Sequence, residues 1–174
     1  MTDLIVFRYG HRLLRDERVT THCCLVARAF GCKKIIIHGM EDPILIKTVQ
    51  SISDRFGGTF KIEFTENWKP VLQQLKQQKY TLVHLTMYGQ LIQKAQKKLK
   101  KTKKIAIIIG SQKVPSDMYT LSDYNVSVTN QPHSEISALA VVLDRLQDST
   151  KIKFKKAKIK IIPTEKGKQV KIQK

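Results

Sequence analysis

Two neighbouring blocks decide the fold of this chain: Ile107-Ile108-Ile109-Gly110-Ser111-Gln112-Lys113-Val114-Pro115 and Tyr124-Asn125-Val126-Ser127-Val128-Thr129-Asn130-Gln131-Pro132-His133-Ser134-Glu135. Each block opens with a β-branched apolar run that is too short to span a membrane. Each run therefore predicts a buried strand, the first ending at Gly110 and the second covering residues 125–129. Apolar residues then recur at helical spacing, which predicts a helix that buries one face: Ile136, Leu139, Ala140, Leu143 and Leu146.

The turns after these strands are rich in glycine and neutral amides. Pro132 is expected to open the following helix, and Glu135 suits the dipole of its first turn. Because ligands of open α/β folds bind at the carboxyl edge of the sheet, two such turns side by side predict a crevice there. Backbone groups and amides suit a nucleoside-like ligand better than a free phosphate. The alternative is two ordinary strand-to-helix turns.

Working outward, the rest of the chain repeats strand, crossover and strand without internal sequence repeats. Strands are predicted at residues 4–7, 34–38, 60–64 and 81–85. Helices are predicted from Thr20 or Thr21 to residue 30, from Pro43 with Asp42 as its cap, from Asn67 to residue 77, and from Gln90. This order predicts an α/β domain with a mainly parallel sheet of about six strands. Trp68 is predicted to be a core residue.

The charge of the chain indicates a polyanionic partner. Its 174 residues carry a formal net charge of +18, which a fold does not need and which costs self-repulsion. Nucleic acid is the leading candidate, ahead of an anionic membrane surface, and a generally lysine-rich proteome is the alternative. Seven lysines fall between Lys94 and Lys104, and ten more between Lys151 and Lys174. The second group alternates with apolar residues, which predicts a β-ribbon with one packed and one basic face. We therefore expect a domain over residues 1–150 and a basic ribbon extension over residues 151–174.

Arginines gather behind the first predicted strand: Arg8, Arg12, Arg15 and Arg18, followed one helix later by Arg28. Arginine is suited to bidentate phosphate contact and to buried charge beside a substrate. The alternative is a solvated charged loop.

Several other classes of protein are excluded by the motif content. The eight glycines include neither GxGxxG nor GxxxxGK[ST], and no serine sits in a nucleophile elbow. Five scattered histidines and few acids supply no metal ligand set, so no metal is expected. The three cysteines have no CxxC or zinc spacing and are expected to be buried reduced thiols of a cytoplasmic protein. No signal peptide and no spanning segment are predicted, so no membrane partner is expected beyond the surface alternative above.

Five stretches in order carry a family resemblance: Gly10-His11-Arg12 with Arg15-Asp16-Glu17-Arg18-Val19-Thr20-Thr21-His22, then Ala27-Arg28-Ala29-Phe30-Gly31, then His84-Leu85-Thr86-Met87-Tyr88-Gly89, then the two opening blocks from Gly110 and from Asn130. Together they resemble the archaeal tRNA cytidine-56 2′-O-methyltransferases, a branch of the SPOUT superfamily. The match runs from about residue 6 to residue 163. Ser111-Gln112 stands where Ala-Glu is commoner in that family, and Cys23-Cys24 replaces small aliphatic residues.

The resemblance implies a SPOUT-like fold with a carboxyl-terminal trefoil knot, a homodimer, and 2′-O-methylation of cytidine 56 in the T-loop of tRNA. It implies S-adenosyl-L-methionine as the cofactor, held by Leu85, Gly110, Ser111, Gln112, Lys113, Val114, Val128, Thr129, Asn130, Gln131, Pro132, His133, Ser134 and Glu135.

Methyl transfer to a ribose hydroxyl needs in-line approach and a 2′-oxygen of lowered proton affinity. On the motif match we expect Arg18 or Arg12 to orient and activate the hydroxyl, with His22 as a proton acceptor. Arg18 is predicted just before its helix, where the rigid helix start would aim it while Asp16 and Glu17 hold it or its neighbours in place. Arg8 and Arg15 are expected to contact the tRNA, and Arg28, which lies inside its helix, is expected to make either a helix-end contact or a phosphate contact. Two other hypotheses stay open: a non-catalytic basic α/β RNA-binding protein, and a nucleotide-binding regulator whose charge only tunes solubility.

Overall fold

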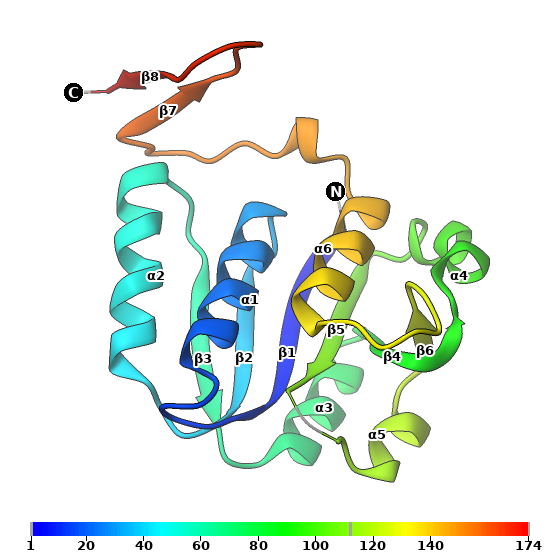
Figure 1. Cartoon of the computed structure of the whole chain (residues 1–174). Coiled ribbons are helices and arrows are strands. Elements are labelled where there is room, and N and C mark those ends of the chain that lie inside the picture. Colours follow the sequence, from blue (N-terminus) through cyan, green and yellow to red (C-terminus); the bar gives the residue numbers. More distant parts are fainter. Residues whose placement is uncertain (1, 112, 174) are drawn as a thin grey trace.

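The computed structural model describes residues 2–111 and 113–173. Six strands form one sheet in the order β3-β2-β1-β5-β4-β6, and every neighbouring pair is parallel. Helices cover both faces of this sheet (Figure 1). The predicted α/β architecture with a parallel sheet of about six strands is therefore confirmed.

The strands of the sheet are β1 (Asp3–His11), β2 (Lys34–Gly39), β3 (Lys61–Thr65), β4 (Thr81–Leu91), β5 (Lys104–Gly110) and β6 (Tyr124–Ser127). The helices are α1 (Glu17–Ala29), α2 (Pro43–Phe56), α3 (Trp68–Gln77), α4 (Ile92–Leu99), α5 (Ser116–Leu121) and α6 (Glu135–Leu146). A short 3₁₀ turn, η1 (Ser149–Lys151), leads to the strands β7 (Ile159–Ile162) and β8 (Gln169–Ile172).

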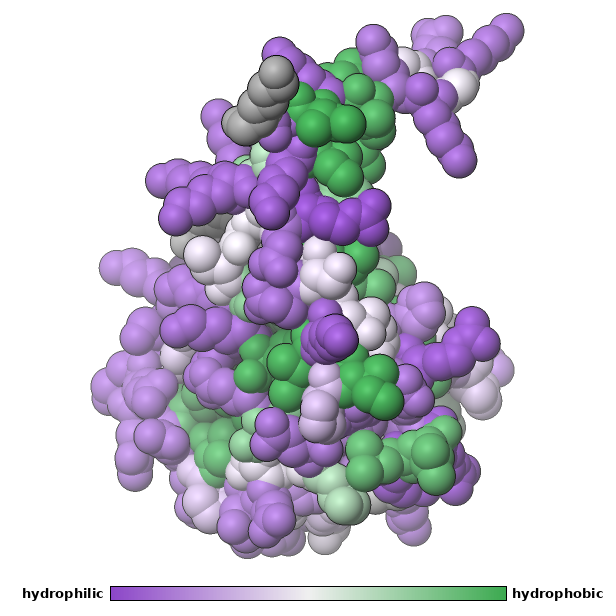
Figure 2. Space-filling model, turned by 90° about the vertical axis from the view of Figure 1, so that its left-hand side faces the viewer, coloured by the Kyte–Doolittle hydropathy of each residue, from purple (hydrophilic) through white to green (hydrophobic). Residues whose placement is uncertain are grey.

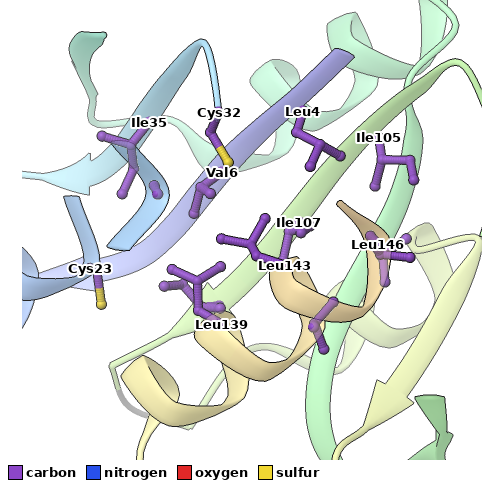
Figure 3. Close-up of a cluster of buried hydrophobic side chains, with 14 of the residues drawn as sticks. Leu4, Val6, Cys23, Cys32, Ile35, Ile105, Ile107, Leu139, Leu143 and Leu146 are labelled. Carbon is purple, nitrogen blue, oxygen red and sulfur yellow. The ribbon is translucent and has the colours of Figure 1, made fainter. Parts of the chain in front are cut away.

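Alternation along the central strand divides the core into two layers. Leu4 and Val6 of β1 face α1, α2, α4 and α6, in the larger cluster shown in Figure 3, while Ile5 and Phe7 face α3 and α5. All four are at most 1% exposed, so the first strand is buried on both faces, as its apolar run predicts. Each such side chain contributes about 1.5–3 kcal/mol by leaving water. Trp68 packs against the smaller cluster, as predicted.

Helix starts show where local sequence signals hold and where they fail. The prediction for α2 is confirmed, because Asp42 Oδ1 accepts the backbone N–H of Leu45 at 3.0 Å and Pro43 is the first helical residue. The prediction for α1 is wrong by one turn. That helix begins at Glu17, and the carbonyl of Asp16 already accepts the backbone N–H of Thr20. Thr20 is buried inside the helix and does not cap it.

The strand in the second of the two blocks that decide the fold also ends earlier than predicted. Strand β6 ends at Ser127, and α6 begins at Glu135 with Ser134 as its N-cap. Pro132 therefore lies ahead of the helix and does not open it. The short helix α5 was not predicted, since six residues with one buried side chain, Met118, show no helical period. Among the described residues no helix has the length and apolar character needed to cross a membrane. The trefoil knot stays a prediction.

The lysine-rich end of the chain crosses the amino edge of the sheet and then forms an antiparallel ribbon, β7 with β8 (Figure 1). Ile159 and Ile162 of β7 are half-buried, whereas every residue of β8 is exposed, so the prediction that one face of this ribbon packs holds for β7 only. The alternation of lysines with apolar residues also produces one exposed and one half-buried side ahead of the ribbon. Between Lys151 and Lys155 the lysines are exposed while Ile152 and Phe154 are half-buried. The division into residues 1–150 and an extension stays a prediction.

Two glycines and one arginine of the domain contact the segment around Phe154 and Lys155. The backbone N–H of Gly58 donates to the carbonyl of Lys155 at 3.0 Å. The guanidinium of Arg28 lies over the ring of Phe154, 4.9 Å from its centroid. At Gly57, with φ of 79°, an added Cβ would lie 2.5 Å from the carbonyl oxygen of Lys155. The backbone of the tail thus packs so closely against Gly57 that this position has no room for a side chain.

We predict that Gly57→Ala lowers the free energy of unfolding by about 1–3 kcal/mol, because it adds both a strained φ and a clash with the tail backbone. The measurement is denaturant unfolding followed by circular dichroism. Gly167→Ala is the matched control, since Gly167 has φ of 91° but no atom within 4 Å of an added Cβ. Equal losses in the two variants would contradict a tightly docked tail.

Candidate functional site

Three loops meet at the carboxyl edge of the sheet, where the crevice was predicted. Two cavities open there, of about 780 Å³ and 210 Å³. Both are lined by Leu85, Thr86, Met87 and Gly110, so they lie on either side of the same pair of strand ends. The larger cavity reaches His84 and Tyr119, whereas the smaller one reaches residues 132–135.

The structure brings about half of the predicted cofactor residues to these cavities: Leu85, Gly110, Lys113, Val114, Pro132, His133 and Glu135. Gln112 lies outside the described residues. The others do not line either cavity, namely Ser111, Val128, Thr129, Asn130, Gln131 and Ser134. Two of these have structural contacts instead, because Val128 packs on the core and Ser134 caps α6.

Asn130 joins two of the loops. Its side-chain amide donates to the carbonyl of Met87 at 2.6 Å and lies 3.3 Å from that of Gly89. The hydroxyl of Ser127 also donates to Gly89, at 3.0 Å. A Cβ on Gly89 would lie 2.5 Å from the backbone of Asn125, so glycine is required for this close approach. Residues 86–89 are therefore held against β6 by backbone carbonyls.

A buried relay fixes the tautomer of His84 beside the larger cavity. The amide nitrogen of Asn125 donates to the carbonyl of Tyr119 at 2.9 Å, which leaves Asn125 Oδ1 to accept from His84 Nδ1, also at 2.9 Å. Nδ1 of His84 thus carries the proton, and Nε2 is an acceptor. Burial lowers the pKa of His84, against a smaller opposing effect of the Asn125 hydrogen bond, so the ring is neutral near pH 7. The sequence showed His84, but neither Asn125 nor Tyr119 could be linked to it.

A buried ion pair connects the first strand to the smaller cavity. Arg8 Nη2 lies 3.3 Å from Glu135 Oε1, and the side chain of Arg8 is 0% exposed. A fully buried guanidinium cannot reach a phosphate at the surface, so the predicted contact of Arg8 with tRNA is wrong. Cys23 lies in the same environment, where burial raises its pKa to about 11 despite the opposing charge of Arg8. The cysteines are buried free thiols, as predicted.

The arginine loop leaves the sheet directly beside this crevice. The backbone N–H of Ser111 donates to the carbonyl of Tyr9 at 3.0 Å, and the Ser111 hydroxyl donates to the carbonyl of Gly10. His11, which follows, is buried between Thr20 Oγ1 at 2.9 Å and Asp42 Oδ2 at 3.5 Å. The base of the loop is therefore tied to the starts of both α1 and α2.

Within the loop, Asp16 holds Arg12. Its carboxylate accepts Arg12 Nε at 2.9 Å and the Arg12 backbone N–H at 3.1 Å, and the hydrogen bond raises the pKa of Arg12. Asp16 was expected to hold Arg18 or a neighbouring residue in place, and the residue that it holds is Arg12. Arg15 is exposed.

Arg18 and His22 share one exposed face of α1, four residues apart. The placement of Arg18 ahead of the helix was wrong, since it stands in the first turn. Arg18 still lies at the start of a helix, so the backbone that carries its guanidinium is held in place as expected.

Arg28 lies away from the crevice, at the opposite edge of the sheet. It is buried, and its donors reach Ser53 Oγ at 3.2 Å and the carbonyl of Gly57. Of the two contacts expected for Arg28, the structure therefore shows the helix-end contact, at the C-cap of α2, and the phosphate contact is wrong because the protein itself uses this guanidinium. Among the described residues no group of three or more His, Cys, Asp or Glu side chains could hold a metal ion.

Comparison with known proteins adds a family to this geometry. A family model described as "tRNA ribose 2'-O-methyltransferase, aTrm56" matches residues 56–171. A tRNA (cytidine(56)-2'-O)-methyltransferase of Nitrosopumilus maritimus is 46% identical over 170 residues, covering 97% of this chain and 96% of the relative. A protein of the same name from Pyrococcus horikoshii is 49% identical over 173 residues, covering 96% and 84%.

Solved structures share the fold at low sequence identity. An A. aeolicus TrmH/SpoU tRNA modifying enzyme aligns with a TM-score of 0.64 at 15% identity, covering 84% of this chain and 74% of that one. An RNA 2'-O ribose methyltransferase aligns with a TM-score of 0.64 at 18% identity, over 83% of this chain but only 55% of that one. The SpoU methyltransferase AviRb from Streptomyces viridochromogenes, solved in complex with AdoMet, has a TM-score of 0.61 at 16% identity, with 83% and 56% covered.

The buried histidine predicts a pH dependence of stability. Because the folded pKa of His84 is lowered, the unfolded chain takes up a proton first as the pH falls below about 6.5. The free energy of unfolding should therefore decrease from pH 7 to pH 5, and His84→Gln should make that decrease shallower while costing about 1–3 kcal/mol at pH 7. Chemical denaturation across this range measures both effects. The control His22→Gln changes an exposed histidine and should keep the wild-type slope; an unchanged slope in His84→Gln would contradict the assignment.

Proposed function

We propose a reaction from one premise: the chain belongs to the aTrm56 family of tRNA ribose 2′-O-methyltransferases. The reaction is the methylation of the ribose 2′-oxygen of cytidine 56 in the T-loop of tRNA. The observation that carries this proposal is the 46% identity to a relative of that name along nearly the whole of both chains. The non-catalytic RNA-binding protein and the nucleotide-binding regulator are not favoured, because neither accounts for this relationship.

The crevice has the chemistry that S-adenosyl-L-methionine requires. When bound, the cofactor supplies an electrophilic methyl group on a sulfonium. The two cavities on either side of Leu85 and Gly110 offer backbone groups and apolar walls, and Glu135 lines the smaller one. His84 Nε2 adds a neutral acceptor at the larger cavity. We propose that the cofactor is held by the residues that line the two cavities in the three loops, namely residues 85–88, Gly110, Lys113, Val114, Pro132, His133 and Glu135. Asn130 would act indirectly, through its hydrogen bond to the carbonyl of Met87.

The ribose hydroxyl must lose its proton as the new oxygen–carbon bond forms and the carbon–sulfur bond breaks. We propose that the guanidinium of Arg18 orients this oxygen and stabilises its developing negative charge, with His22 on the same face of α1 accepting the proton. Arg12, fixed by Asp16, and the exposed Arg15 would bind neighbouring phosphates.

A homodimer is proposed from the outer face of α6. Val141 is 39% exposed there, and Ile136 and Ala140 are half-buried, so the domain leaves part of the apolar surface of α6 uncovered. Val142 is buried in the core. Sedimentation at micromolar concentration that showed only monomers would contradict the dimer.

The activity is tested with unmodified tRNA and labelled S-adenosyl-L-methionine. We expect methyl transfer to tRNA, and no transfer to the same tRNA with 2′-deoxycytidine at position 56. Calorimetry without RNA should show cofactor binding. Cofactor binding without transfer to either RNA would overturn the proposed substrate, and transfer to both would place the methyl group elsewhere.

The role of Arg18 is tested by substitution. Arg18→Ala should lower kcat by about 10²–10³-fold, with cofactor and tRNA affinities little changed, because its contact strengthens in the transition state. Arg18→Lys should rescue poorly, since an ammonium cannot reproduce the planar donor pair. Single-turnover kinetics measures both.

Arg15→Ala is the matched control from the same loop and should raise the KM for tRNA without lowering kcat. If Arg12→Ala is inactive while Arg18→Ala turns over normally, the role passes to Arg12.

A further inference from the structure

A second basic surface lies at the amino edge of the sheet, across the domain from the crevice. Two hollows of about 690 Å³ and 480 Å³ open there and share Lys151. Their lysines come from three separate segments of the chain: Lys33, then Lys100, Lys101 and Lys103, then Lys151, Lys153, Lys155 and Lys156. We call these eight residues the amino-edge surface.

All eight lysines are exposed, and little negative charge opposes them. Among the described residues that line the two hollows, Asp148 is the only carboxylate, and it pairs with Lys151 at 3.0 Å. Asp3 pairs with Lys33. The other six lysines have no ion pair with a carboxylate among the salt bridges of the described residues. A surface of this kind is complementary to a polyanion.

Contacts with the domain fix the backbone that carries several of these lysines. Residues 152–154 run from the 3₁₀ turn η1 to a turn at Lys155 and Lys156, with Lys151, Lys153 and Lys155 exposed and Ile152 and Phe154 half-buried. Buried Arg28 fixes Phe154, and Gly58 fixes the backbone of Lys155. The ribbon beyond projects from the body, with hydrophilic side chains around its base (Figure 2). A free lysine tail would need none of these contacts.

Strand β5 separates the amino-edge surface from the crevice. Lys103 immediately precedes this strand and Gly110 ends it, so the two sites are about 20 Å apart. An RNA that placed one ribose in the crevice could reach the surface only with another part of its backbone.

We propose that the amino-edge surface binds the phosphate backbone of tRNA at a region remote from the methylated nucleotide. This proposal rests on the proposed function for the identity of the RNA. Affinity would come from two separate contact regions, the arginine loop beside the crevice and the lysines at the far edge. The far contact carries no sequence information but selects a folded tRNA over an isolated stem-loop.

The test compares two double variants of the full chain. Lys101→Gln with Lys153→Gln removes one charge from each hollow, and Lys47→Gln with Lys79→Gln removes two exposed charges from outside the surface. Binding to whole tRNA is measured from low to high salt. The surface variant should bind roughly tenfold more weakly and lower the slope of log affinity against log salt by about 2. The control should keep the wild-type slope.

Two further measurements show which results would contradict the proposal. An isolated T-arm hairpin should bind the surface variant and the wild type with equal affinity. If the surface variant loses as much affinity for the hairpin as for whole tRNA, the remote contact is overturned. An unchanged tRNA slope, or a loss confined to binding of phosphatidylserine vesicles, would overturn the RNA assignment. If the wild type does not methylate tRNA but the slopes still differ as expected, the surface stands and the proposed reaction fails. Cofactor binding by calorimetry should be the same in all three proteins.

Discussion

The ion pair between Arg8 and Glu135 is the constraint on which the crevice depends. A guanidinium with no exposed surface must be paired, and removing one partner of such a pair costs about 3–5 kcal/mol. The pair therefore requires the start of α6 to lie over the end of β1. That requirement sets the course of residues 128–134, which must return from β6 to this point. The smaller cavity is a consequence, because Glu135 lines it while it holds the helix in place.

The fold could be predicted from the sequence because its strongest signals are local. Runs such as Ile107 to Ile109 are apolar on both faces, which only a sheet covered on both sides can bury, whereas the edge strand β3 was found from alternating polar and apolar residues. The cap at Asp42 with Pro43 behind it is equally local. The positions of three crevice loops followed, since parallel strands end at one edge.

Errors arose where a residue acts over a long distance. Arg8 and Arg28 both look like phosphate ligands in a chain with this charge, yet each is taken by a partner more than 25 residues away, Glu135 in one case and Gly57 in the other. Thr20 has a hydroxyl that could cap a helix, but it lies within α1, where that hydroxyl is hydrogen-bonded to His11. No local pattern distinguishes a buried arginine from an exposed one, because the difference lies in what the folded chain brings to it.

The central position of β1 bears on how the molecule is made. As the chain is synthesised, β1 can pair with β2 soon after both have left the ribosome, but its other neighbour, β5, begins only at Lys104, and Glu135, the partner of Arg8, is 127 residues further along. Contacts of such long range form slowly. The nascent chain must therefore carry an open edge of β1 until β5 has been synthesised, and Arg8 lacks Glu135 until α6 begins. Translation speed and chaperone occupancy over the first hundred residues should thus influence how much active enzyme a cell obtains.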